Sequence, residues 1–217
     1  MDKKTPASGI RPRERIMDAA VRLFSQKGYA AVGVREIAAE AGVNISMISY
    51  YFEGKVGILR AIMESFFEGY LKVFDVPEAD SKSAEECARE IMGGLVGYVR
   101  SNLDLALVAY NELPLEVPEI AEIKVEWVKR MLKRAAWILM RLGLDPEDGI
   151  QIGVVGPTLF SMVMMHFRIR PIQRVVFGLK FDDAYYERFV QTASTLFLDG
   201  IHGIADRKTA LKRKQNE

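Results

Sequence analysis

A short stretch near the N-terminus concentrates small hydroxyls, tyrosines and one ammonium group. Its members are Ser46, Ser49, Tyr50, Tyr51 and Lys55. Hydroxyl groups can donate to or accept from base edges, and tyrosine and lysine side chains donate to phosphate oxygens. Met47, in the same stretch, offers apolar contact only, for example with a thymine methyl group. This chemistry fits recognition of DNA, provided that one helix presents these side chains on its outer face.

The surrounding residues predict two short helices, over residues 34–41 and 45–52, joined by a turn that contains glycine. Asn44 is a strong N-cap for the second helix, because its side-chain oxygen can accept from the free amides of the first turn. Ile48 and Phe52 are four residues apart and should face the core. A helix-turn-helix of this kind places its second helix in the DNA major groove.

The flanking segments are also predicted to be helical. A first helix should begin near Pro12, since proline suits the first helical turn, and should end at Gly28 as a left-handed cap. A fourth helix, apolar over a wide arc, should follow the turn at residues 53–55. The sequence shows no repeats and no alternating strand pattern of useful length.

The rest of the chain reads as a helical body. Helices are expected over residues 83–101, 103–113, 118–142, 146–167 and 183–201. Asp145 and Pro146 should cap the fourth of these, Pro171 should break it, and Asp182 should cap the last. The predicted fold is therefore all-α. Its segments are a flexible basic arm (1–11), a helix-turn-helix domain (12–54), a helical effector-binding and dimerisation domain (55–205) and a polar, frayed tail (206–217).

Charge is distributed unevenly along the 217 residues, although the net charge is only +1. Residues 1–60 carry ten lysines and arginines against six acidic residues, whereas the remainder is mildly acidic. A basic N-terminal module on an acidic body favours a phosphate-facing domain joined to a different one.

The composition also indicates the cellular compartment in which the protein is expected. The single cysteine, Cys87, excludes an intrachain disulfide and fits a reducing environment. The polar N-terminus predicts no signal peptide, and the apolar run at residues 150–167 contains Gln151 and Pro157, so we expect a buried helix rather than a membrane span. The expected location is the cytoplasm.

No catalytic or metal-binding constellation is apparent, so an enzyme is not expected. His166 and His202 are the only histidines, too few for a triad or a site with several histidine ligands. The glycine pairs at residues 93–94 and 153–156 lie in helical patterns without the lysine and hydroxyl of a phosphate loop. No cofactor is expected.

The helix-turn-helix residues resemble the TetR (tetracycline-repressor-like) family of bacterial transcriptional regulators. The matching residues are Ile37-Ala38, Ala41-Gly42-Val43, Tyr50-Tyr51-Phe52, Lys55 and Leu59. The match covers about the first 60 residues, and the body matches only as a helical segment of suitable length. Three positions depart from the family pattern, because Gly33 replaces a threonine cap, Ser49 a frequent tyrosine and Tyr51 a frequent histidine.

The resemblance and the chemistry together assign roles on DNA. Ser46 and Met47 should meet base edges, and Tyr51 and Lys55 should contact phosphate. Tyr50 is either a structural residue or a phosphate contact. The full set of expected DNA-binding residues is Gly33, Arg35, Asn44, Ser46, Met47, Ser49, Tyr50, Tyr51 and Lys55. Neither Ser46 nor Met47 gives a strong bidentate base contact, so an operator sequence cannot be read from them.

Large adaptable side chains in the body are candidates for an apolar ligand pocket. They are Tyr98, Tyr110, Trp127, Met131, Phe160, Met164 and Phe167, and each could equally be core. Arg100, Asn111 and Glu112 are candidates for orienting a ligand.

The resemblance implies a homodimeric regulator that binds a palindromic double-stranded operator, most simply a repressor released by a small, largely apolar effector. The dimer should form through the last two long helices, residues 146–167 and 183–201. Membranes are not expected partners. Two alternatives remain open: a constitutive or architectural DNA-binding protein without an effector, and a helical enzyme or binding protein.

Overall fold

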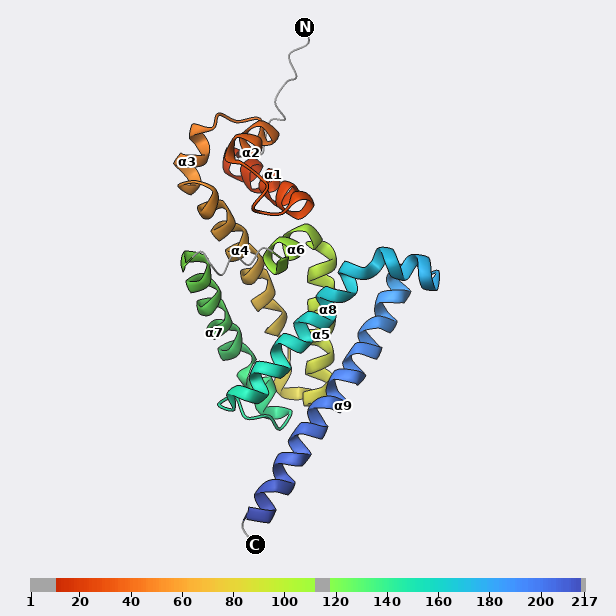
Figure 1. Cartoon of the computed structure of the whole chain (residues 1–217). Helices are drawn as coiled ribbons and strands as arrows, with labels where there is room; N and C mark the ends of the chain where they lie inside the picture. Colours follow the sequence, from red (N-terminus) through yellow and green to blue (C-terminus); the bar gives the residue numbers. More distant parts are fainter. Residues whose placement is uncertain (1–10, 112–117, 216–217) are drawn as a thin grey trace. The chain divides into compact units, whose positions relative to one another are not determined.

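The computed structural model describes residues 11–111 and 118–215, and the regular elements it shows there are all helices (Figure 1). The longer helices are α1 (Pro12–Lys27), α2 (Val34–Ala41), α3 (Ser46–Phe52), α4 (Lys55–Leu71), α5 (Ala84–Ser101), α6 (Leu103–Asn111), α7 (Pro118–Arg141), α8 (Gly149–Phe177) and α9 (Asp183–Gln215). Two short 3-10 helices, Lys72–Phe74 and Ala79–Ser81, lie between α4 and α5. The predicted all-α fold is confirmed. The expected basic arm at residues 1–10 lies outside the described residues.

The chain divides into two compact units. The first combines the N-terminal helices through Glu68 with residues Asp104–Lys124, and the second combines Gly69–Leu103 with residues from Val125 onward. The helices α4 and α7 therefore contribute to both units. The expected boundary between residues 54 and 55 falls inside the first unit.

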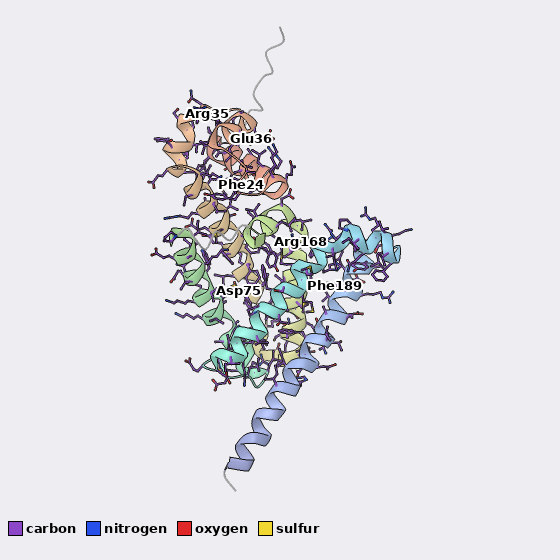
Figure 2. All side chains as sticks on the ribbon, in the orientation of Figure 1. Phe24, Arg35, Glu36, Asp75, Arg168 and Phe189 are labelled. Carbon is purple, nitrogen blue, oxygen red and sulfur yellow. The ribbon has the colours of Figure 1, made fainter. Side chains whose placement is uncertain are left out.

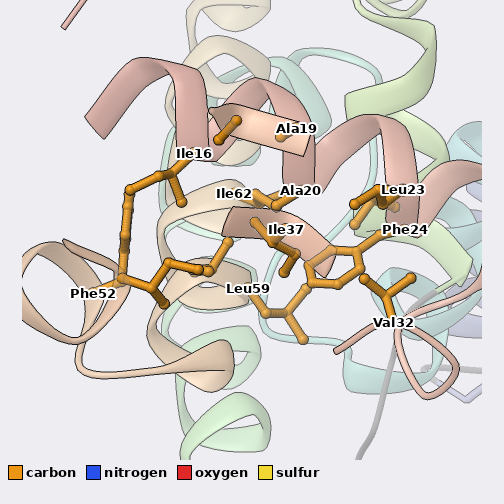
Figure 3. Packing of buried hydrophobic residues seen from close by; sticks show 14 of the residues in the cluster. Ile16, Ala19, Ala20, Leu23, Phe24, Val32, Ile37, Phe52, Leu59 and Ile62 are labelled. Atoms are coloured by element: carbon orange, nitrogen blue, oxygen red, sulfur yellow. The ribbon is translucent and has the colours of Figure 1, made fainter. Parts of the chain in front are cut away.

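The core of the first unit is built from the apolar stripes that the sequence spacing predicts. Figure 3 shows side chains from α1, α2, α3 and α4 meeting in one cluster. Its buried members are Ile16, Ala19, Ala20, Leu23, Phe24, Val32, Ile37, Ala38, Ala41, Ile48, Phe52, Ile58, Leu59, Ile62 and Met63, together with Val108 and Ile120. Full burial of a large apolar side chain contributes about 1.5–3 kcal/mol, so this cluster is sufficient to fix the short helices α2 and α3 in place.

Helix ends in the first unit follow backbone rules. Gly42 ends α2 in the left-handed region, with φ 62° and ψ 41°, as the turn requires. Gly28 differs from the expectation of a left-handed cap. Its φ of 82° is positive but its ψ is 151°, so the chain leaves α1 in a more extended direction.

In the second unit α5 packs along α9 and also contacts α8. A capping box begins α5, because the Ser83 hydroxyl accepts from the Glu86 N–H at 3.1 Å and the Glu86 carboxylate accepts from the Ser83 N–H at 2.7 Å. At the end of α7 the Arg141 guanidinium donates to the carbonyl oxygens of Ala79, at 2.8 Å, and of Lys82. This arginine ties the segment before α5 to α7.

The helix α8 differs from the prediction at both ends. Its N-cap is Asp148, whose carboxylate accepts from the N–H groups of Ile150 and Gln151, whereas Asp145 accepts from the Glu147 N–H in the preceding turn. Pro171 does not break the helix, which continues to Phe177 and ends at Gly178. A proline inside a helix removes one hydrogen bond and costs about 3 kcal/mol, which contacts between α8 and α9 can offset.

The last helix also extends beyond its expected end. Asp182 caps it as predicted, with its carboxylate accepting from the Tyr185 N–H at 2.9 Å. The helix then continues through Gln215 rather than ending near residue 201. The expected polar tail from residue 206 is therefore helical as far as the structure describes it.

Much of α8 is apolar and uncovered in the single chain. By length and composition it is the one described helix that could cross a membrane, and 33% of its most apolar window is buried. Its exposed apolar residues are Ile150, Val154, Met165, Ile172, Val175, Val176 and Phe177. A surface of this kind requires a covering layer.

Candidate nucleic-acid interface

The start of α3 is held by a side-chain cap. The Asn44 Oδ1 atom accepts from both the N–H and the Oγ of Ser46, each at 2.9 Å, which confirms the predicted capping contact. The Ser46 hydroxyl therefore uses its hydrogen toward Asn44 and presents its oxygen lone pairs outward. In this state Ser46 can act as an acceptor at a base edge.

The exposed face of α3 carries small polar groups and one aromatic ring. Ser46, Ser49 and Tyr50 are exposed and follow the spacing i, i+3, i+4, whereas Ile48 and Phe52 are buried on the opposite side. Tyr50 is 79% exposed. The helix therefore presents one polar face to solvent while its apolar face is fixed in the core of the first unit.

The two tyrosines at the end of α3 differ in exposure. Tyr51 is partly buried and packs against the core of the first unit, while Tyr50 projects outward. Their rings meet edge to face, with centroids 4.9 Å apart. The structural reading of Tyr50 is thus wrong, and Tyr51 supports the position of its neighbour. Met47 also packs against the core rather than lying free on the surface.

Two cationic side chains flank α3. The Lys55 ammonium lies 4.2 Å from the centre of the Tyr29 ring, so this side chain is held near the amino end of α4, where free amides favour an anion. Arg35 is exposed on α2 (Figure 2). Gly33, the N-cap of α2, is also exposed, and a β-carbon there would meet nothing within 4 Å. Packing therefore does not require glycine at this position.

Ion pairs between α1 and α2 are peripheral. Arg22 pairs with Glu40 at 3.2 Å and Lys27 pairs with Glu36, and all four side chains are exposed. Exposed pairs contribute about 0–1 kcal/mol each. The apolar core, rather than these pairs, determines the orientation of α2 and α3.

Known proteins share the sequence features of this first unit. The family model described as bacterial regulatory proteins, tetR family, matches residues 16–62. The chain is 33% identical over 116 residues to the probable HTH-type transcriptional regulator YttP of Bacillus subtilis, covering 52% of this chain and 56% of YttP. It is 30% identical over 168 residues to the HTH-type transcriptional repressor LfrR of Mycolicibacterium smegmatis, covering 66% of this chain and 84% of LfrR.

This chain belongs to the TetR family. The chain spans about half the length of the first curated relatives it matches, whereas its match to LfrR extends over most of that repressor. A solved structure of the transcriptional regulator FadR from Bacillus subtilis, in complex with stearoyl-CoA, has a TM-score of 0.63 and 22% identity, covering 87% of this chain and 99% of that one. At this identity the likeness concerns the fold alone.

The expected pocket residues of this TetR-family chain belong to both compact units. Tyr110 and Asn111 belong to the first unit, and the other described candidates belong to the second. Trp127, Met164 and Phe167 are buried, and Phe160 meets the Tyr70 ring edge to face at 5.6 Å. Tyr98 and Met131 are partly buried. Glu112 lies outside the described residues, and Asn111 is the last residue of α6.

Two of these candidates are engaged in contacts with α9. The Arg100 guanidinium pairs with Asp183 at 2.7 Å and lies 4.5 Å from the centre of the Tyr186 ring. Phe167 stacks on the same ring with centroids 5.7 Å apart. Both residues therefore link α9 to the rest of the second unit. A surface depression of about 590 Å³ lies elsewhere, at the turn from α8 to α9, and none of the expected pocket residues lines it.

An aromatic cluster surrounds His166 between α8 and α9. The imidazole stacks on Phe189 with centroids 4.1 Å apart (Phe189 is labelled in Figure 2) and on Tyr185 at 5.5 Å. Burial, aided by the nearby Arg170 guanidinium, lowers the pKa of His166 to about 4. This histidine is therefore neutral at pH 7. Among the described residues no cluster of metal-ligating side chains occurs.

Sequence reasoning overlooked two residues with functional chemistry. Ile45 is 43% exposed beside Ser46, and a large apolar residue directly after the capping asparagine was the available signal. Lys124 interrupts the apolar face of α7 formed by Ile120, Trp127 and Met131. Its Nζ atom is buried without a hydrogen-bond partner, and the charge within an apolar stripe was the signal.

Proposed function

We propose that this protein is a dimeric transcriptional repressor that binds a palindromic operator and is released by a small, largely apolar effector. The observation that carries the proposal is the polar outer face of α3, held by a buried helix-turn-helix core. Family membership supports it, since relatives such as LfrR are transcriptional repressors. A cytoplasmic location fits this role.

The contacts with DNA follow from side-chain chemistry. We assign base edges to Ile45, Ser46 and Ser49, where Ile45 can meet a thymine methyl group and Ser46 can accept from an amino group. We assign phosphate contacts to Tyr50 and Lys55, which have a hydroxyl and an ammonium group to donate. Arg35 and the backbone at Gly33 extend this phosphate surface along α2.

A second copy is the proposed covering layer for α8. Its exposed residues Ile150, Val154, Met165 and Ile172 share one face by helical spacing, and Leu196 of α9 is also exposed. One short recognition helix gives little affinity, and a two-fold dimer would place two of them about 34–36 Å apart, or a multiple of it, to match two half-sites. A second copy of the chain would therefore both supply the second recognition helix and cover the exposed apolar face of α8.

The effector mechanism rests on α4. This helix begins three residues after α3 ends and contributes residues to both compact units. A ligand that prefers one arrangement of α4 would shift the population of operator-competent dimers, limited by its difference in affinity between the two states. Because FadR of Bacillus subtilis was solved with stearoyl-CoA, we propose an effector with an acyl or similar apolar chain.

The test begins with selection of bound DNA from random sequence, which should return an inverted repeat. Tyr50→Ala and Lys55→Ala should weaken binding to that repeat about tenfold or more, and Lys55→Ala should also flatten the salt dependence. Fluorescence anisotropy at several salt concentrations measures both effects. Lys129→Ala, an exposed lysine of α7, is the matched control and should leave binding unchanged.

Other outcomes would contradict specific parts of the proposal. Recovery of no symmetric sequence would contradict operator recognition. An operator complex that ignores a screen of acyl-CoA thioesters and other apolar ligands would favour a constitutive DNA-binding protein. Unchanged affinity in both head variants would show that α3 does not face DNA in the assigned orientation.

A further inference from the structure

Lys124 is a charged residue on the inner face of a helix. It lies in α7 one turn from the fully buried Ile120 and three residues before the buried Trp127. Residues three and four apart share a helix face, so its side chain leaves α7 on the apolar side. Its Nζ atom is buried and has no hydrogen-bond partner among the described residues.

The two described acids of α7 nearest to Lys124 in sequence do not compensate this ammonium group. Glu126 pairs with Arg130 at 3.1 Å, and Glu122 is exposed. Both lie two residues from Lys124, where side chains do not face each other on a helix. None of the ion pairs among the described residues includes Lys124.

An unpaired buried ammonium group is unfavourable, because its hydration is lost without a compensating charge. Burial lowers the pKa of Lys124 to about 8. The group is therefore still mostly protonated at pH 7. A charge that is kept in such a position is expected to serve a function, for example by pairing with an anionic group of another molecule.

We propose that Lys124 is the anchor for an acidic group on the effector, so that the effector is an amphipathic anion with a carboxylate or phosphate on an apolar body. This inference rests on the proposed function and narrows its ligand class. An ammonium group only donates hydrogen bonds. A neutral carbonyl would satisfy one donor but leave the charge uncompensated, whereas an anion satisfies both requirements.

The first experiment measures thermal unfolding of the protein without ligand. Lys124→Met keeps the length and apolar volume of the side chain and removes the charge, so it should raise Tm. Lys129→Met, an exposed lysine five residues further along α7, is the matched control and should leave Tm unchanged. A lower Tm for Lys124→Met would reveal an acid of the same chain already paired with it and would overturn the proposal.

The second experiment compares three probes with the same chain length: dodecanoate, lauroyl-CoA and dodecanol. Calorimetric titration of the full-length protein, below the concentration of micelle formation, gives each Kd. Wild-type protein should bind an anionic probe at least about tenfold more tightly than dodecanol, as expected for a charge-assisted hydrogen bond in a dry site. The first two probes distinguish a free carboxylate from the phosphates of a thioester.

The variants then identify the anchor. Lys124→Met should abolish the preference for the anion while its affinity for dodecanol stays the same or rises, and Lys129→Met should behave as wild type. Wild-type protein that binds no anionic probe more tightly than dodecanol, or a preference that survives in Lys124→Met, would overturn the inference.

Operator binding without any probe separates this inference from the proposed function. If wild-type protein and both lysine variants bind the selected repeat equally, the regulator assignment stands whatever the titrations show. If none of them binds DNA specifically, the proposed function fails independently of Lys124.

Discussion

His166 is a titratable group whose surroundings keep it neutral. Its ring stacks on those of Phe189 and Tyr185, and its Nε2 atom is buried without a hydrogen-bond partner among the described residues. The guanidinium groups of Arg100, Arg170 and Arg174 approach the cluster. Arg100 lies near Tyr186, Arg170 near Phe167, and both Arg170 and Arg174 near Phe181. Additional positive charge on the imidazole would therefore be repelled as well as desolvated.

This environment predicts a stability that falls with acidity. The pKa of His166 is about 4 in the folded state, against the ordinary histidine value of 6.5, so the unfolded chain binds a proton that the folded chain rejects between these values. Stability is fully present above about pH 6.5 and falls as pH decreases toward 4. We expect a loss of about 1–2 kcal/mol from this residue between about pH 7.5 and pH 5. Urea unfolding at the two pH values measures it.

The matched variant separates this residue from other titrating groups. His166→Phe keeps an aromatic ring in the cluster and should remove this part of the pH dependence, while His202→Phe, at an exposed histidine, should retain it. Equal pH dependence in wild type and His166→Phe would show that the imidazole is not responsible.

Sequence spacing correctly predicted the burial or capping role of several α3 residues, and it could have predicted the exposure of others. Asn44, Ile48 and Phe52 were placed correctly because capping chemistry and helical period act locally. The different exposure of Tyr50 and Tyr51 could also have been predicted, because Phe52 marks the buried side and Tyr50, two residues before it, is turned further from it than Tyr51 is. The pocket residues could not be grouped, because large apolar side chains look alike in core and in ligand sites.

At the scale of elements, a close approach joins the end of α4 to α5. A β-carbon on Gly69 would lie 2.4 Å from the Tyr98 hydroxyl oxygen and 2.5 Å from two ring carbons. Tyr98 is partly buried, and this burial raises its pKa to about 12. A side chain at Gly69 therefore forces the Tyr98 ring to move.

Two alanine substitutions test this contact. Gly69→Ala should destabilise the protein by about 1–3 kcal/mol, the usual cost of overpacking. Gly97→Ala, on α5 beside Tyr98, meets nothing within 4 Å and should be neutral or stabilising by up to about 1 kcal/mol through helix propensity. Chemical denaturation of both variants gives the comparison. Equal stabilities would mean that Tyr98 adjusts freely and that α4 and α5 are not tightly fitted here.

Element boundaries were predicted well where local chemistry decides them and poorly where tertiary contacts do. Asp182 caps α9 as expected, and α5 begins close to its expected start at residue 83, where Ser83 caps it. Pro171 was expected to end α8, because a proline inside a helix costs about 3 kcal/mol. Contacts between α8 and α9 can offset this cost, and such tertiary contacts cannot be read from the local sequence. The hydrogen bond from Arg170 to the Tyr186 hydroxyl, at 2.9 Å, is one such contact.

At the scale of the whole molecule, two exposed apolar stripes compete for the second copy. One follows α8 and contains Met165, which is 46% exposed. The other follows α7 and includes Val128, which is 45% exposed. The α8 stripe is longer and is joined by Leu196 of α9, whereas the α7 stripe adjoins Lys129 and Lys133. Because the α8 stripe is longer and extends onto a second helix, we propose that the dimer forms through α8 and α9.

A charge placed in each stripe distinguishes the two surfaces. Met165→Glu should convert the dimer to a monomer, because burying an unpaired carboxylate at an interface costs several kcal/mol, and operator affinity should fall by about a hundredfold or more as paired binding is lost. Val128→Glu, at a residue of equal exposure, should remain dimeric and bind DNA normally. Light scattering after size-exclusion chromatography reports the mass, and anisotropy reports the affinity. Dissociation in Val128→Glu alone would place the interface on α7 and leave the α8 stripe to another partner.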